Sequence, residues 1–377
     1  MIVYLLIAFC LLVLLYAYVG YPRFLAKKAT GKSLAYAAYL SQDELPCVYI
    51  LIPVHNEEKV IIQKLKSVFE SSYPQKKIQV LIGLDACTDN TKKNIQKNFS
   101  TYPIQLFDFT ERQGKPAMLN KLMAYATEKN AITIFTDADI FFNQNTLFEL
   151  VKYFKDERIG LVDTIIQTQR STDNNEQFYW NYENEIKWNE SLVYGKITGP
   201  SGGCYAIRTK LYEEIPVNFV VDDFFIGMKI ALKKYHTIVN KEALAIEEIQ
   251  TNWIQEFRRK SRIASGNFQN LWYFKKTAFQ VYTPLGFIFF SHKFLRWKTP
   301  FILLILYYLL LFKATLLILI VTFILPVFDA ICAIFGWAIK PLRRLHYFLF
   351  MNLAVFWGFI NFCKGIKSNV WQPTPRK

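Results

Sequence analysis

Acidic residues follow three short apolar runs in this chain of 377 residues, at spacings that could build a site for a metal ion and phosphates. The acidic segments are NEE at 56–58, DACTDNT at 85–91 and TDAD at 136–139. A single Asp after a strand often only caps the next helix, so each segment alone predicts little. Three in succession predict carboxylates that meet at one edge of a sheet, where their oxygens can hold a hard divalent cation and substrate phosphates.

Other catalytic patterns are missing from the sequence. No GxGxxG follows the first apolar run, which argues against hydride transfer from a dinucleotide, and no GxxxxGK[ST] is present, which excludes a P-loop NTPase. The four histidines lie far apart, and no two of the six cysteines have CxxC spacing. The chain therefore predicts neither a zinc site nor a disulfide framework.

The elements that must position the carboxylates read as alternating strands and helices between residues 46 and 250. The apolar runs 48–53, 80–84 and 131–135 predict buried parallel strands, and a helical pattern over 56–71 follows the first of them. This alternation predicts an α/β fold with a doubly wound sheet, whose ligands lie at the carboxyl ends of the strands.

The charge distribution points to a membrane. The formal net charge is +15, and residues 251–377 hold 17 basic and 2 acidic residues, interleaved with long apolar runs. A nucleic-acid-binding protein would instead carry a basic stripe on a soluble surface. Cations that flank apolar segments indicate anchoring with the basic side in the cytoplasm, so we expect membrane lipid and no nucleic acid among the partners.

Several segments have the composition of membrane elements. Residues 2–19 are uncharged over about the 20 residues that cross a bilayer, with no basic region before them and no cleavage site after them, so 1–22 predict a retained transmembrane helix. Lys27 and Lys28 follow it and place the catalytic region in the cytoplasm. Residues 251–298 predict interfacial amphipathic helices, 299–363 predict C-terminal transmembrane helices, and 364–377 form a basic tail. Whether 299–338 is a hairpin or one helix with a re-entrant piece stays open. We expect a multi-pass protein of the inner membrane.

Four motifs together resemble those of membrane-bound family 2 glycosyltransferases with the GT-A (Rossmann-like) fold. The chain is similar to bacterial exopolysaccharide, hyaluronan and poly-N-acetylglucosamine synthases. IPVHNEE resembles IPxxNEE, DACTDNT resembles DxSxDxT, RQGKPAMLN resembles GKxxxLN, and TDAD resembles the DXD motif. The resemblance covers the anchor, the catalytic region and the C-terminal membrane segment.

The resemblance implies roles for individual residues. Asp85 would hold the uracil or ribose of the donor, Asp89 would order its loop, and Lys115 would lie near the phosphates. Asp139 would ligate Mg or Mn, with Asp137 beside it on the nucleotide and the metal. The nucleotide-sugar site would comprise Pro53, Asn56, Glu57, Asp85, Asp89, Lys115, Asp137, Arg259 and Arg262.

Two later segments resemble acceptor-side and catalytic motifs. GPSGGCYAIR at 199–208 is similar to the family's acceptor-side stretch, which would place Gly202, Gly203 and Cys204 near the acceptor. A glycine-rich turn that enters a strand explains it equally well. Asp222 and Asp223 match the ED motif with Asp in place of Glu, which implies that Asp223 is the general base; the alternative is a capping pair at a helix start.

The last motif departs from the family pattern. Polysaccharide synthases carry QxxRW, whereas EFRRKSRI at 256–263 has Ile263 where Trp is expected, which places processive polymerisation in question. Arg259 and Arg262 lie three residues apart on one helical face, suited to gripping a diphosphate. A basic face that rests on anionic lipid is the alternative.

The sequence thus predicts inverting transfer from a nucleotide diphosphate sugar, with UDP-sugar as the expected donor, to a growing glycan or lipid-linked acceptor. The reaction would occur at the cytoplasmic membrane face and serve cell-surface polysaccharide synthesis. Two alternatives stay open: a non-processive transferase that adds one sugar to a polyprenyl-linked acceptor, and an inactive membrane scaffold of the same fold. Export or assembly proteins are candidate partners.

Overall fold

The computed structural model describes residues 1–169, 174–248, 253–311, 327 and 340–366, which form two compact units. We call residues 28–169 and 182–248 the sheet unit. We call residues 1–27 and 174–181, with the described part of 253–365, the helical unit. Each unit is described by itself.

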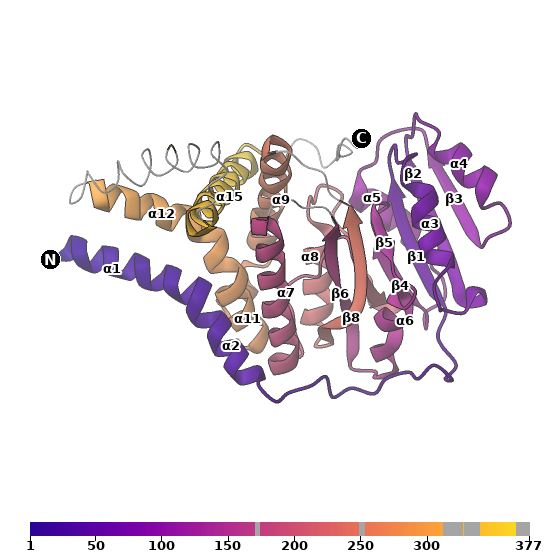
Figure 1. The fold of residues 1–377 in the computed structure, drawn as a ribbon, viewed down its shortest axis with the longest axis horizontal. Coiled ribbons are helices and arrows are strands. Elements are labelled where there is room, and N and C mark those ends of the chain that lie inside the picture. Colours follow the sequence, from indigo (N-terminus) through magenta and orange to yellow (C-terminus); the bar gives the residue numbers. More distant parts are fainter. Residues whose placement is uncertain (170–173, 249–252, 312–326, 328–339, 367–377) are drawn as a thin grey trace. The chain divides into compact units, whose positions relative to one another are not determined.

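The sheet unit is built on an eight-stranded sheet with the order β3-β2-β1-β4-β7-β6-β8-β5 (Figure 1). Strands β3, β2, β1 and β4 run parallel, as predicted, whereas β7 runs antiparallel to both of its neighbours, so the sheet is mixed. The strands are β1 (Val48–Val54), β2 (Ile78–Asp85), β3 (Ile104–Phe109), β4 (Ile132–Thr136), β5 (Ile140–Phe142), β6 (Ile159–Gln169), β7 (Cys204–Arg208) and β8 (His236–Glu248).

The burial of the central strands on both faces explains why their sequences are continuously apolar. All seven residues of β1 are buried, because helices cover both faces of a parallel sheet. Val48 pairs in register with Ile78 on one side and with Ile132 on the other. This register brings the carboxyl ends of β1, β2 and β4, and the acidic segments that follow them, to the same edge of the sheet.

The helices of the sheet unit pack on this sheet with their apolar faces inward. The expected helix over 56–71 begins only at Ile61, because residues 55–58 instead form a loop in which Asn56 has a φ of 53°. The helices are α3 (Ile61–Phe69), α4 (Thr91–Asn98), α5 (Lys115–Met123), α6 (Thr146–Val151), α8 (Asp222–Leu232) and the part of α7 (Asn174–Tyr194) from residue 182 onward, with short 3₁₀ turns at Gln75–Lys77, Lys152–Lys155 and Thr209–Leu211.

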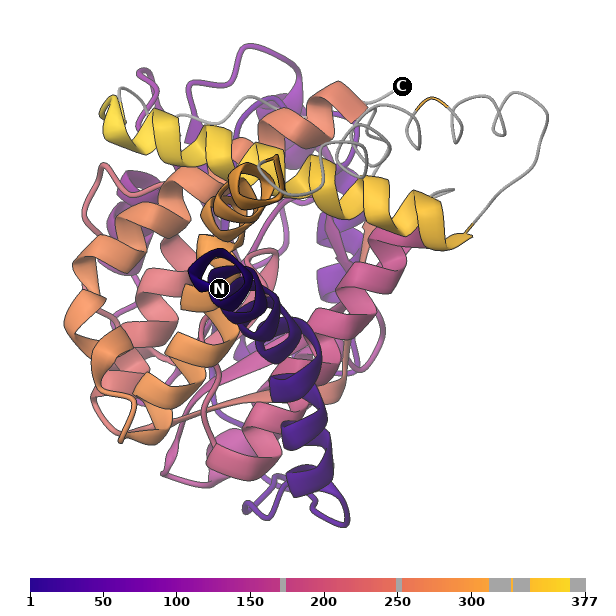
Figure 2. The ribbon, with the colours of Figure 1, turned by 90° about the vertical axis from the view of Figure 1, so that its left-hand side faces the viewer.

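The helical unit consists of long apolar or amphipathic helices. Helix α1 packs against α12, and α9 packs against the yellow α15 (Figure 2). Hydrogen bonds between Tyr16 and Ser291 (2.9 Å) and between Tyr18 and Thr299 (3.1 Å) join the first helix to the later ones. The elements are α1 (Ile2–Leu15), η1 (Tyr16–Gly20), α2 (Tyr21–Ala29), α9 (Trp253–Tyr273), α10 (Lys275–Phe279), α11 (Pro284–Ile288), η5 (Phe289–Phe294), α12 (Leu295–Leu311) and α15 (Lys340–Cys363).

Within the described residues, three helices are long and apolar enough to cross a membrane: Ile2–Ala29, Pro284–Leu311 and Leu342–Cys363. The first contains the anchor expected over 1–22. The second candidate span begins at Pro284, fifteen residues before the expected start at 299. Most of the open question over 299–338, and the basic tail beyond residue 366, lie outside the described residues.

Candidate active site

The loops that follow β1 and β2 interlock at the carboxyl edge of the sheet. The side-chain oxygen of Asn56 accepts a hydrogen bond from the Thr88 amide at 2.8 Å, and the Glu57 amide donates to Thr91 at 2.9 Å. The carboxylate of Asp89 accepts from the amides of Glu58 and Thr91, both at 3.0 Å. This geometry is what a loop-ordering role of Asp89 requires.

Pro53, Asn56 and Glu57 lie at the start of this arrangement. Pro53 is buried in β1 and lies in register with Gly83 of β2. Glu57 is buried as well, while Asn56 is half-buried at the turn. The half-buried side chains of this loop are therefore those of Asn56 and Glu58.

Asp85 ends β2 and is fully buried. Its carboxylate accepts hydrogen bonds from the amides of Gln113 and Gly114 (2.5 and 3.2 Å) and from Nε of Arg112 (3.2 Å). Gly114, with a φ of 79°, takes the left-handed turn that leads into α5 and brings its amide to Asp85. The charge of Asp85 is thereby compensated, and Arg112, which the sequence did not single out, lies beside it.

Lys115, the first residue of α5, joins three of the predicted motifs. Its Nζ lies 2.7 Å from Oδ1 of Asp137, 3.9 Å from Oδ2 of Asp222 and 3.4 Å from the carbonyl oxygen of Gly202. Burial lowers the pKa of Lys115, but the carboxylates of Asp137 and Asp222 outweigh burial and raise it overall. Lys115 is therefore a fixed cation between the DXD segment and the second acidic pair.

Asp222 and Asp223 are the first two residues of α8, and Val221 occupies the N-cap position. Neither Asp222 nor Asp223 is therefore the N-cap residue that the alternative expected. Both carboxylates nevertheless lie in the first turn, where the helix dipole favours negative charge. Burial raises the pKa of Asp223 to about 7, and the Asp222 carboxylate adds to the rise while Lys115 opposes it. A carboxylate with this pKa can exchange a proton near neutral pH.

The glycine-rich loop reaches both acidic groups. A Cβ added at Gly202 would lie 2.6 Å from Oδ2 of Asp223, so the loop backbone approaches the carboxylate as closely as only glycine allows. The carbonyl oxygen of Gly203 accepts a hydrogen bond from the Asp137 amide at 3.0 Å. Cys204 is the first residue of β7, pairs with Thr136 and is fully buried, so its thiol belongs to the core rather than to the loop surface.

The DXD segment has the donors that a hard divalent cation prefers. Asp137 and Asp139 lie in the turn between β4 and β5, and both are partly exposed. Within the described part of the chain, no group of three His, Cys, Asp or Glu side chains could enclose a metal ion. Two partly exposed carboxylates can hold a hard divalent cation whose remaining ligands are phosphate oxygens of a substrate.

Lys64 is a buried residue that the sequence analysis missed. From α3 its Nζ donates to Oγ1 of Thr136 at 2.8 Å and to the carbonyl of Ile140, so it connects the two ends of the DXD turn. Burial lowers the pKa of Lys64 to about 7, against the charges of the nearby acidic groups. The available signal was a lysine on an apolar stripe, formed by Ile61, Lys64, Leu65 and Val68 at helical spacing.

Arg259 and Arg262 lie on α9 in the helical unit. The geometry described above concerns the sheet unit alone, so the expected role of these arginines stays a prediction. Within the helical unit, Nζ of the intervening Lys260 lies 5.3 Å from the ring centroids of both Tyr179 and Trp180.

Comparisons with known proteins concern the region that holds this site. Residues 49–216 match the family described as Glycosyl transferase family 2. The probable glycosyltransferase YdaM of Bacillus subtilis is 24% identical over 241 residues, which cover 59% of this chain and 56% of that protein. A poly-beta-1,6-N-acetyl-D-glucosamine synthase of Staphylococcus aureus is 27% identical over 124 residues, 33% of this chain and 29% of that protein.

A third relative is the beta-monoglucosyldiacylglycerol synthase of a Nostoc species, 28% identical over 142 residues, 37% of this chain and 29% of that protein. The chain thus spans about half the length of these curated relatives, or less. Among solved structures, the mannosyltransferase PcManGT of Pyrobaculum calidifontis, in complex with GDP-Man and Mn²⁺, is similar with a TM-score of 0.73. It is 21% identical, and the match covers 95% of this chain and 99% of that one.

The structural likeness concerns the fold, and the family match concerns the region that holds the interlocked loops, the DXD turn and the glycine-rich loop. Residues 49–216 thus match the model of glycosyl transferase family 2, and the sheet unit has a GT-A-like fold similar to that of PcManGT.

Proposed function

We propose that this protein is an inverting, cation-dependent glycosyltransferase that moves a sugar from a nucleotide diphosphate sugar to an acceptor hydroxyl. The observation that carries the proposal is the position of Lys115, which lies within ion-pair distance of both Asp137 and Asp222. This cation brings the DXD turn and the general-base segment into one site, with Asp223 beside the glycine-rich loop.

The chemistry follows from these residues. Asp223 accepts the proton of the acceptor hydroxyl as its oxygen forms a bond to the anomeric carbon. The bond from that carbon to the diphosphate oxygen breaks, and the diphosphate leaves with the electron pair. Lys115 supplies positive charge beside the departing phosphates. A cation held by Asp137 and Asp139 would neutralise further charge on the diphosphate.

A UDP-sugar is the donor that we propose, because Asp85 resembles the family position that holds uracil or ribose. Arg112, whose Nε lies 3.2 Å from the Asp85 carboxylate, adds a cation beside this position. PcManGT was solved with GDP-Man, so GDP-sugars must be tested beside UDP-sugars.

The acceptor that we propose is a growing glycan or a lipid-linked sugar at the cytoplasmic face of the inner membrane, for cell-surface polysaccharide synthesis. The three candidate membrane spans in the described part of the chain support a membrane location. Ile263 in place of the expected Trp favours the second candidate, addition of a single sugar to a lipid-linked acceptor. Under either candidate, export or assembly proteins are proposed partners.

The decisive experiment incubates the full-length protein in nanodiscs with a panel of labelled UDP- and GDP-sugars, and compares it with Asp223→Asn. This change preserves shape and removes the base, so we expect transfer to fall by about 10²–10⁴-fold while nucleotide binding survives. Product sizing distinguishes single addition from polymerisation. Wild-type protein that binds nucleotide but transfers no sugar to any acceptor fraction would support the inactive scaffold instead.

A further inference from the structure

We propose that a buried ion pair between Asp163 and Lys187, which contacts no substrate, is a positioning device for the glycine-rich loop and for the general base that the loop touches. The catalytic half of this inference depends on the sugar transfer proposed above. The ion pair contacts the loop through Ser201. Neither of its members was singled out by any sequence motif.

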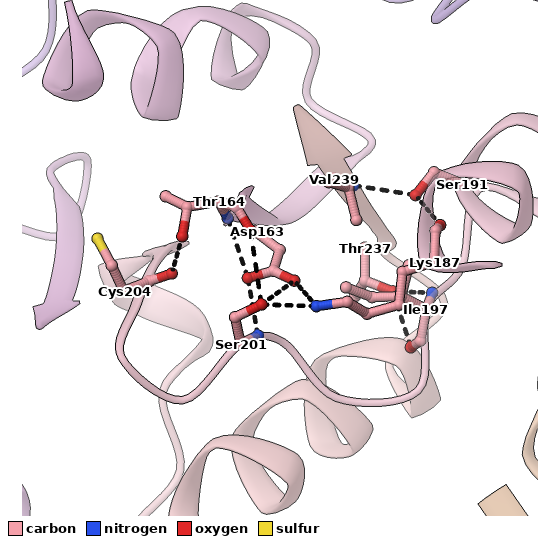
Figure 3. A network of polar contacts seen from close by, with 9 residues as sticks. All are labelled: Asp163, Thr164, Lys187, Ser191, Ile197, Ser201, Cys204, Thr237 and Val239. Atoms are coloured by element: carbon pink, nitrogen blue, oxygen red, sulfur yellow. Dashed lines mark hydrogen bonds and ion pairs between the residues drawn. The ribbon is translucent and has the colours of Figure 1, made fainter. Parts of the chain in front are cut away.

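The pair is enclosed by the protein. Asp163 lies in β6 with no exposed surface, Lys187 lies on α7, and Nζ of Lys187 is 2.7 Å from Oδ2 of Asp163 (Figure 3). Burial raises the pKa of Asp163, and Lys187 opposes the rise. Ser201 of the loop contacts both partners, and its hydroxyl lies 2.6 Å from Nζ of Lys187.

Ser201 connects the ion pair to the loop through hydrogen bonds. Its amide donates to Oδ1 of Asp163 at 2.8 Å, and its hydroxyl lies 3.3 Å from Oδ2 of the same carboxylate (Figure 3). A second anchor follows three residues later, where Thr164 Oγ1 donates to the Cys204 carbonyl at 2.7 Å. The segment between these anchors contains only Gly202 and Gly203.

Those two glycines are the residues that reach the candidate catalytic groups. Gly202 lies against Oδ2 of Asp223, and its carbonyl lies 3.4 Å from Nζ of Lys115. The carbonyl of Gly203 accepts from the Asp137 amide. A shift of Ser201 therefore moves the backbone that packs on the base, and misplacements of about 1 Å at such sites can cost about 10²-fold in rate.

Stability alone does not account for a buried ion pair. Desolvating two charges is so costly that a well-packed apolar pair of similar volume is often as stable or more stable. What an apolar pair cannot supply is oriented acceptors and donors for the amide and the hydroxyl of Ser201. The geometry thus assigns Asp163 and Lys187 the task of fixing the loop.

The test compares Ser201→Ala with Ser191→Ala. Ser191 is equally buried in the same network, where its hydroxyl donates to the Lys187 carbonyl and accepts from the Val239 amide, but it does not touch the loop (Figure 3). Ser201→Ala loses hydroxyl contacts with the two charged groups of the pair, whereas Ser191→Ala loses hydroxyl contacts with backbone groups. We expect Ser201→Ala to lower kcat about 10- to 100-fold. We also expect it to move the midpoint of the pH–rate profile, while Ser191→Ala stays within about twofold of wild type and keeps the midpoint.

A second variant and a second readout complete the design. If Lys187 acts through Ser201, Lys187→Met and Ser201→Ala together lower kcat no more than the larger single change. Amide hydrogen exchange of residues 202 and 203 should accelerate in Ser201→Ala but not in Ser191→Ala. If Lys187→Met fails to fold, the two serine variants still decide the question.

The outcomes separate the two proposals. Equal kcat, equal pH midpoints and equal loop exchange in the two serine variants would overturn the positioning role, even with an active wild type. An inactive wild type would refute the sugar transfer and with it the catalytic half of the inference, while loop exchange would still report whether the ion pair holds the loop.

Discussion

Asp223 must be ionised to accept a proton, so its surroundings determine the pH at which the proposed reaction runs. Burial and the charge of Asp222 raise the pKa of Asp223 to about 7. Transfer should therefore increase with pH through about 7 and level off above it. Because the two carboxylates interact, the observed midpoint belongs to the pair and to Lys115 rather than to one residue.

Asp222→Asn tests the electrostatic part of this account. The change removes the negative charge that opposes ionisation of Asp223, so the rising limb of the pH–rate profile should move to lower pH. The limb is measured as log kcat against pH, so that a lower maximum does not obscure the shift. A limb that moves upward or stays in place would show that Asp222 does not raise the pKa of the base.

Gly202→Ala tests the close approach of the loop to Asp223. The new Cβ would lie 2.6 Å from Oδ2, and the carboxylate, as the end of a flexible side chain, can rotate away without unfolding the protein. We expect a loss of kcat of at least about tenfold with a small change in melting temperature.

The matched control for that change is Gly203→Ala, whose Cβ would meet the ends of Ile166 and Ile140 at 2.9–3.1 Å. Crowding of apolar side chains costs stability, typically about 1–3 kcal/mol, rather than the position of the base. Because the Gly203 carbonyl also accepts from the Asp137 amide, Gly203→Ala should lose melting temperature and kcat together, whereas Gly202→Ala should lose kcat with little change in melting temperature. If both glycine variants lose activity in proportion to their stability, the contact with Asp223 has no specific role.

At the scale of elements, the turn between β4 and β5 depends on a neighbouring helix. Lys64 on α3 donates to Thr136 before the DXD segment and to Ile140 after it, and it lies 3.8 Å from the centroid of the Phe142 ring. One nitrogen thus holds the two ends of the turn that carries Asp137 and Asp139.

Lys64→Met removes this donor and keeps the apolar stem. We expect the turn to loosen and the affinity for Mn²⁺ in the presence of UDP to fall about tenfold, as measured by calorimetry. Lys66→Met, on the exposed face of the same helix, is the control and should leave affinity unchanged. Equal affinities in the two variants would mean that the turn holds its shape without Lys64.

At the scale of the whole molecule, the membrane helices should place the sheet unit in the cytoplasm. The first candidate span ends at Ala29, and by the positive-inside rule the basic residues Lys27 and Lys28 predict that this end faces the cytoplasm. In a variant without native cysteines, Lys76→Cys, on an exposed turn, should react with an impermeant maleimide only after the cells are opened. Ile2→Cys, at the other end of the helix, should react in intact cells. The reverse labelling pattern would show that the sheet unit lies on the outer side of the membrane.

The chemistry-bearing motifs and the first half of the sheet could be predicted from local sequence. The runs 48–53, 80–84 and 131–135 became β1, β2 and β4 with shifts of one or two residues at their ends. A continuous apolar run bounded by polar turns has few other low-energy solutions in an α/β protein. The antiparallel placement of β7 between β4 and β6 was not foreseen, because strand order depends on pairings between distant segments.

What the sequence by itself determined is therefore which carboxylates follow which strands, and where charge and apolar length anchor the chain. Only the tertiary structure decided that Lys115 lies between Asp137 and Asp222, that Gly202 abuts Asp223, and that Lys187 pairs with Asp163. These partners are separated by tens of residues, and their meeting depends on register and helix packing rather than on local propensity. The buried Lys187 follows the same logic, because burying a cation is favourable only where the fold supplies its acceptors.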